Sequence, residues 1–183
     1  LGGELLGADQ APAGTKRIGN LLRSPDWSNE DVEQYIQQDG LEQLQILEEQ
    51  GQRVLAIWDE SVLEKPESIA SQGLCPVRSS KAKRLMRIKR GYYNPPTSRP
   101  VIVPGYQWLG LLIAGIHRGV SVLKFQWWTS RGKPAEQRQN LLEQCLDWAK
   151  EQLSGVWHVF DRGFCGAPWL GSLLAANLCF VIR

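Results

Sequence analysis

Two short apolar runs in the chain end abruptly in a carboxylate. Residues 54–58 read Val-Leu-Ala-Ile-Trp and are followed by Asp59, and residues 156–160 read Val-Trp-His-Val-Phe and are followed by Asp161. Apolar runs of this length, bounded by polar residues, predict buried β-strands and not helices. Because ligands of open α/β sheets bind beyond the carboxyl ends of the strands, we expect both acids to contribute to one site.

The rest of the hydrophobic pattern predicts a mixed sheet with flanking helices. The expected elements, in order, are a strand at 53–59, a long loop at 60–104, strands at 107–116 and 120–128, a helix from Pro134 to Gly155, the strand that ends at Asp161, a helix at 166–176 and a strand at 179–183. The short Gly-containing connection at 117–119 favours an antiparallel hairpin, and the later helices favour parallel pairing. Ribonuclease-H-like folds share this order, and in them the first and fourth strands are neighbours.

The chain before the first strand predicts a small helical lead-in. Residues 1–15 lack a clear period, and we expect an irregular arm there. Residues 16–52 form the lead-in, in which Ser28 caps a helix that we expect to break at Asp39-Gly40 before a further helix begins. The sheet domain is then expected to span 53–183.

The charge of the chain is unevenly distributed. The 183 residues carry a formal net charge of +2 and 43% hydrophobic residues, which suits a single folded domain. No acid occurs between residues 78 and 90, where the basic residues are Arg78, Lys81, Lys83, Arg84, Arg87, Lys89 and Arg90. Such a run indicates either an anionic partner or a solvated surface.

Two further composition signals narrow the class of protein. The four cysteines are scattered without a C-x-x-C pair, so we expect reduced thiols in place of a zinc site. The most apolar run, 108–116, is much shorter than the roughly 20 residues that span a bilayer, so we expect no membrane partner.

Paired strand-end carboxylates predict a cation site. Two such groups repel each other unless a cation or a proton lies between them, and hard oxygen ligands suit Mg²⁺ or Mn²⁺. A substrate that brings phosphates and matches a basic run is nucleic acid. Ser61 either orients Asp59 or supports the turn, and Arg162 either approaches a phosphate or pairs with an acid. Taken singly, each Asp could equally cap a turn.

Aromatic and histidine side chains have simpler interpretations. Trp127 and Trp128 could stack on unpaired bases, although we expect at least one of them to pack in the core. His117 and His158 are expected to be structural, since His158 lies in mid-strand among apolar neighbours.

Four stretches in this order resemble the DDE transposases of bacterial insertion sequences, of the insertion-sequence-4-like type. They are Ile57-Trp58-Asp59-Glu60-Ser61, Gly105-Tyr106-Gln107-Trp108-Leu109-Gly110, Trp127-Trp128-Thr129-Ser130-Arg131-Gly132-Lys133, and Asp161-Arg162-Gly163-Phe164 with Phe180-Val181-Ile182-Arg183. The resemblance implies a ribonuclease-H-like DDE domain that binds Mg²⁺ or Mn²⁺ through Asp59, Asp161 and a Glu. It also implies cut-and-paste DNA transposition, DNA as partner, a possible homodimer, and a bacterial cytoplasmic, nucleoid-associated location.

The chain departs from that family in one respect. The family's third acid is a Glu downstream of the fifth strand, and no Asp or Glu follows Asp161 here. The chain is therefore interpreted as a transposase fragment, with the fold incomplete at its C-terminus and apolar sheet surface exposed. The alternatives are a catalytically dead remnant that only binds DNA or an intact transposase, and a different nuclease in which Glu60, Glu64 or Glu67 replaces the missing acid.

Overall fold

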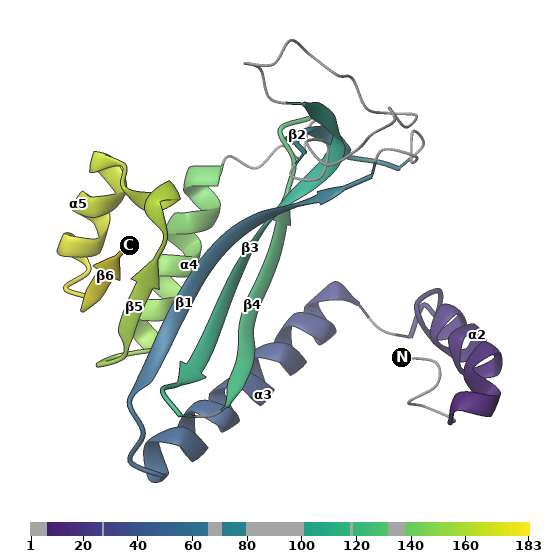
Figure 1. The fold of residues 1–183 in the computed structure, drawn as a ribbon, viewed down its shortest axis with the longest axis horizontal. Helices are drawn as coiled ribbons and strands as arrows, with labels where there is room; N and C mark the ends of the chain where they lie inside the picture. Colours follow the sequence, from purple (N-terminus) through teal and green to yellow (C-terminus); the bar gives the residue numbers. More distant parts are fainter. Residues whose placement is uncertain (1–6, 27, 66–70, 80–100, 118, 132–137) are drawn as a thin grey trace. The chain divides into compact units, whose positions relative to one another are not determined.

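The computed structural model describes residues 7–26, 28–65, 71–79, 101–117, 119–131 and 138–183. The chain divides into two compact units, Leu1–Tyr35 and Ile36–Arg183. Figure 1 shows the fold coloured along the sequence. No helix in the described ranges is long and apolar enough to cross a membrane.

The first unit contains helices from residue 8 onward. A 3₁₀ turn, η1 (Ala8–Gln10), leads into α2 (Ala11–Leu21), and α3 (Asn29–Glu49) begins within this unit. The expected irregular arm is therefore wrong for residues 8–15, because Pro12 lies in the first turn of α2, where a missing N–H costs nothing. The predicted cap is confirmed: Asp31 N donates to Ser28 Oγ (3.2 Å) and Ser28 N donates to the Asp31 carboxylate (2.6 Å).

The second unit is built on a six-stranded mixed sheet with the order β2-β3-β1-β5-β6, in which β4 also pairs with β3. The strands are β1 (Val54–Glu64), β2 (Cys75–Arg78), β3 (Ile102–Gly115), β4 (Val120–Trp128), β5 (Trp157–Phe160) and β6 (Phe180–Ile182). The β3–β4 hairpin is antiparallel, as predicted. The predicted pairing of the first and fourth strands is also confirmed, since β1 and β5 lie side by side and parallel.

The expected loop at 60–104 is partly wrong. β1 continues to Glu64, β2 lies inside the segment, and β3 begins at Ile102. Prolines and glycines suggested breaks, yet Pro76 lies on β2, which is the edge strand of the described sheet and so tolerates a missing donor. Gly105 is needed because a Cβ there would come within 2.5 Å of both Leu63 O and Val77 Cγ2 on the flanking strands.

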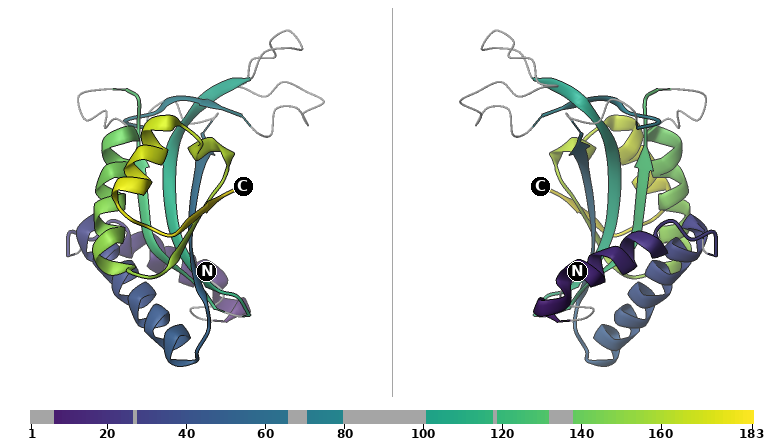
Figure 2. Two further views of the ribbon diagram at one scale, coloured as in Figure 1. Left: turned by 90° about the vertical axis from the view of Figure 1, so that its left-hand side faces the viewer. Right: turned by 90° about the vertical axis from the view of Figure 1, so that its right-hand side faces the viewer.

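Helices cover one face of this sheet, as Figure 2 shows from two sides. α4 (Arg138–Gln152) and α5 (Ala167–Ala175) follow the strands that they pack on, and α3 adds Leu44 and Leu47 to the same core. The predicted break at Asp39-Gly40 is wrong: α3 runs straight through it. Gly40 is retained because a Cβ there would meet Val122 O and Leu123 Cδ2, both at 2.7 Å.

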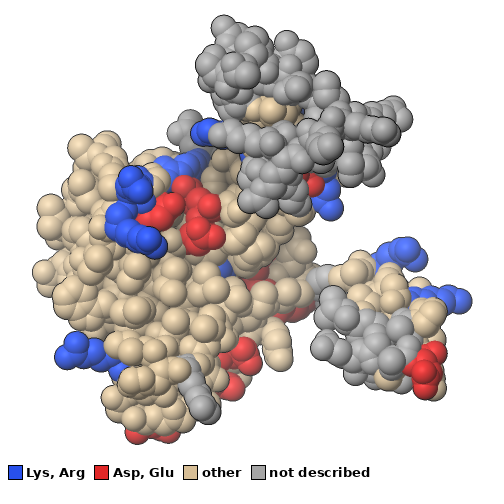
Figure 3. All heavy atoms as spheres, in the orientation of Figure 1, with Lys and Arg blue, Asp and Glu red and all other residues tan. Residues whose placement is uncertain are grey.

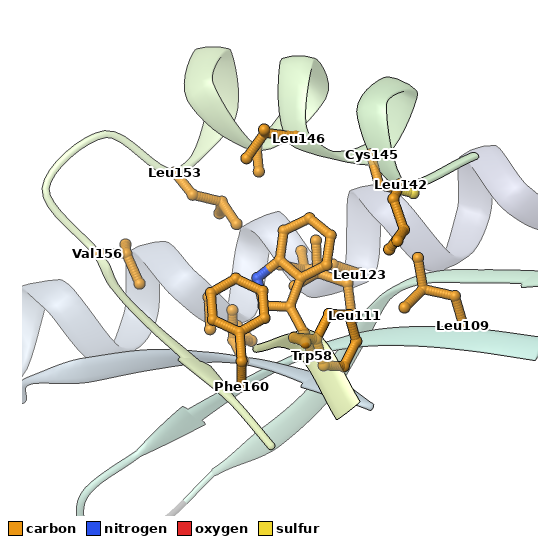
Figure 4. Packing of buried hydrophobic residues seen from close by; sticks show 14 of the residues in the cluster. Trp58, Leu109, Leu111, Leu123, Leu142, Cys145, Leu146, Leu153, Val156 and Phe160 are labelled. Carbon is orange, nitrogen blue, oxygen red and sulfur yellow. The ribbon is translucent and has the colours of Figure 1, made fainter. Parts of the chain in front are cut away.

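The core is centred on Trp58 of β1 and Phe160 of β5, whose rings lie 5.3 Å apart between the sheet and α4 (Figure 4). Both are about 1% exposed. Because Trp58 and Phe160 are also the last paired residues of the parallel ladder, this packing fixes the two strands directly before their acids.

The opposite face of the sheet is apolar and incompletely covered. We call it the open face; its members are half-buried or exposed and comprise Leu55, Ile57, Leu112, Trp157, Val159 and Val181. Trp157 is 48% exposed and Val181 is 49% exposed. The described helices of the second unit place none of their buried residues against this face, because all of them join the core on the other side.

Candidate metal centre

Asp59 and Asp161 occupy equivalent places on neighbouring parallel strands. The register pairs Leu55 with Trp157 and ends with Trp58 beside Phe160. One residue further along, the two strands carry Asp59 and Asp161. The acids therefore lie at the same end of the sheet, and Asp59 experiences the charge of Asp161.

Asp161 is held in place by the turn that follows it. It is the N-cap of a 3₁₀ turn, η3 (Arg162–Phe164), and its Oδ1 accepts a hydrogen bond from Gly163 N at 2.8 Å. A Cβ at Gly163 would lie 2.9 Å from that oxygen, so glycine lets the chain turn tightly around the carboxylate. The capping role weighed from the sequence is thus real for Asp161, and it occupies only one of the two carboxylate oxygens.

Asp59 lies in an electrostatically unfavourable place. Asp59 is exposed, yet partial desolvation of its carboxyl raises the pKa of this group, and the negative charge of Asp161 raises it further. Neither acid has an ion-pair partner among the residues that the structure describes. Two neighbouring carboxylates that form no ion pair with the described residues are suited to holding one hard divalent cation.

The carboxylates next in sequence serve other partners. Glu60 points to the helix-covered face and forms a two-pronged ion pair with Arg138, with Nε–Oε1 at 2.6 Å and Nη2–Oε2 at 2.7 Å. Glu64 accepts a hydrogen bond from Ser79 Oγ at 2.8 Å. Glu67 lies outside the described residues. Within the described ranges, no group of three His, Cys, Asp or Glu side chains is placed to hold a metal ion.

The structure describes only some of the other predicted site residues. Ser61 lies on the same face of β1 as Asp59 and is half-buried, without a hydrogen bond to the Asp59 carboxylate. Arg162 is exposed directly after Asp161, and Arg78 is exposed at the end of β2. The remaining residues of the basic run lie outside the described residues: Lys81, Lys83, Arg84, Arg87, Lys89 and Arg90. Figure 3 shows acidic and basic side chains side by side over the upper ends of α4 and α5.

The expectations for the tryptophan pair and for His158 are confirmed, whereas His117 is exposed and its expected structural role stays a prediction. Trp128 is buried in the core, whereas Trp127 is 44% exposed and packs edge-on against Tyr106 and Phe125. His158 is structural, fully buried beside Trp58.

Sequence reasoning missed Arg138. Nothing in the sequence around Arg138 marks it, because the anionic partner of its guanidinium is Glu60, far away in the chain. The partner itself, 78 residues away, is visible only in the fold.

No protein-family model and no curated protein matches the chain.

Proposed function

We propose that the chain is a ribonuclease-H-like domain of a DDE transposase, in which Asp59 and Asp161 together bind a divalent cation for chemistry on DNA. One observation carries this proposal: two carboxylates end adjacent parallel strands, and neither forms an ion pair with a described residue. The strand order adds support, because an antiparallel β1-β3-β4 meander followed by parallel β5 and β6 is the order of ribonuclease-H-like sheets.

Each of the three site residues, Asp59, Asp161 and Arg162, has a role that follows from its position. Asp161, which accepts a hydrogen bond from Gly163 N, and Asp59 would together hold the cation, and the charge of the Asp59 carboxylate would cost less with a cation bound. Exposed Arg162 stands next to the pair, where it would meet the phosphate backbone of DNA. A bound Mg²⁺ would supply Lewis-acid activation of a phosphodiester.

A second candidate function is binding of DNA, or of an intact transposase, without cleavage. It is favoured by the described acids themselves, which provide two ligand residues and no third. Both candidates share the cation site, so the site is tested first and cleavage second.

The test of the site is the affinity for Mn²⁺, measured from the electron paramagnetic resonance signal of the free ion. Asp59→Asn and Asp161→Asn should each weaken binding by at least about tenfold, because each removes one anionic ligand. Asp161→Asn keeps an oxygen that can accept from Gly163 N, so its fold should persist. Asp147→Asn, an exposed acid on α4, is the matched control and should bind as the wild type does. Unchanged affinity in both site variants would overturn the proposal.

Cleavage then separates the two candidates. If supercoiled DNA is nicked in the presence of Mn²⁺ and the nicking is lost in Asp59→Asn, the chain is a nuclease of the proposed kind. If DNA is bound with a steep salt dependence but is never nicked, the binding function holds instead.

A further inference from the structure

Consecutive side chains of β1 alternate between the two faces of the sheet. Asp59 and Glu60 are consecutive, so they point to opposite faces of the sheet. Glu60 accepts both prongs of the Arg138 guanidinium, at 2.6 and 2.7 Å, and the pair is partly shielded from water, with side-chain exposures of 39% for Arg138 and 21% for Glu60. A bidentate pair of this kind fixes direction as well as distance.

The same guanidinium reaches the turn that Asp161 begins. Arg138 Cζ lies 5.6 Å from the centre of the Phe164 ring, within the range of a cation–π contact. Phe164 is buried at the end of η3 and packs against Phe160 at 5.3 Å. Arg138 therefore touches the residue directly after Asp59 on one side and the three-residue turn directly after Asp161 on the other.

The contacts of Arg138 with Glu60 and Phe164 lie just beyond the end of the β1–β5 pairing. The β1–β5 register ends at Trp58 and Phe160, one residue before the acids. Two carboxylates that repel each other tend to move apart unless the backbone behind them is held. The guanidinium of Arg138 is bound to Glu60, on the face of β1 opposite to Asp59, so Arg138 does not act by neutralising the pair.

We propose that Arg138 is a positioning residue, which clamps Glu60 and Phe164 from the helix-covered face and so sets the separation of Asp59 and Asp161 for a divalent cation. The inference rests on the proposed cation site and deepens it. It extends the site by the pair Glu60–Arg138, which touches neither the cation nor a substrate.

The test uses the sign of the electrostatic effect. Removing a positive charge near a cation site should by itself strengthen Mn²⁺ binding. If the clamp sets the separation of the two acids, Arg138→Gln will instead weaken Mn²⁺ binding, by about tenfold. Loss of a supporting residue behind metal ligands typically has an effect of this size. Arg138→Lys, which cannot form the two-pronged contact, should recover only part of the affinity. Arg131→Gln, an exposed arginine away from the clamp, is the charge-matched control and should bind at least as well as the wild type.

A double substitution shows whether the clamp is one unit. Glu60→Gln combined with Arg138→Gln should weaken Mn²⁺ binding by no more than the larger of the two single effects, because cutting either half opens the same clamp. Circular dichroism at the assay temperature checks that each variant is folded.

Wild-type protein that fails to bind Mn²⁺ would overturn the cation site itself. Wild-type protein that binds, together with an Arg138→Gln variant that binds equally well or better, would overturn the clamp alone.

Discussion

His158 is fully buried in the middle of β5, and its two ring nitrogens are in different situations. Nδ1 accepts a hydrogen bond from Trp58 Nε1 at 2.9 Å, which places the single proton of the neutral ring on Nε2. Nε2 is buried without a partner among the described residues. A second proton would have to go to Nδ1, so it would break the bond to Trp58 and leave a charge inside the core.

We therefore expect the protein to lose stability in mild acid. Burial lowers the pKa of His158 from 6.5 to about 4, so between these values the unfolded chain binds a proton that the folded chain excludes. The free energy of unfolding should fall as the pH drops from about 6.5 to about 4, by an upper bound of about 3 kcal/mol. Below about pH 4 this contribution is fully lost, and above pH 6.5 it is fully present.

Urea denaturation at several pH values checks this expectation. His158→Gln keeps an oxygen that can accept from Trp58 but does not titrate, so its unfolding free energy should change less between pH 7 and pH 4.5 than that of the wild type. His117→Gln, at an exposed histidine in the hairpin, is the control and should retain the wild-type slope. Equal slopes in the wild type and His158→Gln would refute the assignment.

The sequence predicted the structural role of His158 because polar residues in mid-strand among apolar neighbours are normally satisfied inside the core. It could not predict that Trp58 is the partner, since the two residues are 100 positions apart. The acids behave likewise: their place at strand ends is visible in the pattern, whereas the Glu60–Arg138 clamp behind them depends on how α4 packs on β1.

Among the elements, α3 shows how packing overrides local preference. Gly40 suggested a helix end, yet it lies inside α3 because the helix approaches β4 too closely for a side chain. Asp39 accepts a hydrogen bond from Ser121 Oγ at the same crossing (3.1 Å). The β3–β4 hairpin was predictable from its short connection, and the pairing of β1 with β5 from the fold that shares this element order. The strand β2 and the extent of β1 and β3 were hidden by prolines and glycines that the neighbouring strands accommodate.

A pair of alanine substitutions tests this crossing. In an ordinary helix, Gly→Ala stabilises by roughly 0.5–1 kcal/mol. Gly171→Ala on α5 should show that gain, because a Cβ there meets nothing within 4 Å. Gly40→Ala should instead destabilise by about 1–2 kcal/mol, since its Cβ would collide with backbone and side chain of β4. Urea midpoints of the two variants decide, and a stabilising Gly40→Ala would mean that α3 does not pack as closely as described.

At the scale of the whole sheet unit, the open face is the feature with the largest expected effect on behaviour in solution. Exposed apolar surface of this kind favours association and dye binding. Replacing Trp157 and Val181 together by Thr should reduce the fluorescence of bound 8-anilinonaphthalene-1-sulfonate and lower self-association in sedimentation velocity. Both residues lie on strands, where Thr is well tolerated.

The control for this experiment is Leu174→Gln on α5, which removes a side chain that is 70% exposed but lies on a helix. It should leave dye binding and association close to the wild-type values. A wild-type chain that sediments as a single monomer at all concentrations and unfolds cooperatively would contradict the expectation that this face needs a cover.

The central position of β1 also has a consequence for the order in which the protein is made. One edge of β1 pairs with β3, but its other edge waits for β5, whose Trp157 lies about 100 residues after Leu55 in the chain. At a synthesis rate of about 5–20 residues per second, that wait is roughly 5–20 s. During that interval the nascent chain holds Asp59 without Asp161, so the repulsion between the two carboxylates arises only with the last stage of sheet assembly on the ribosome.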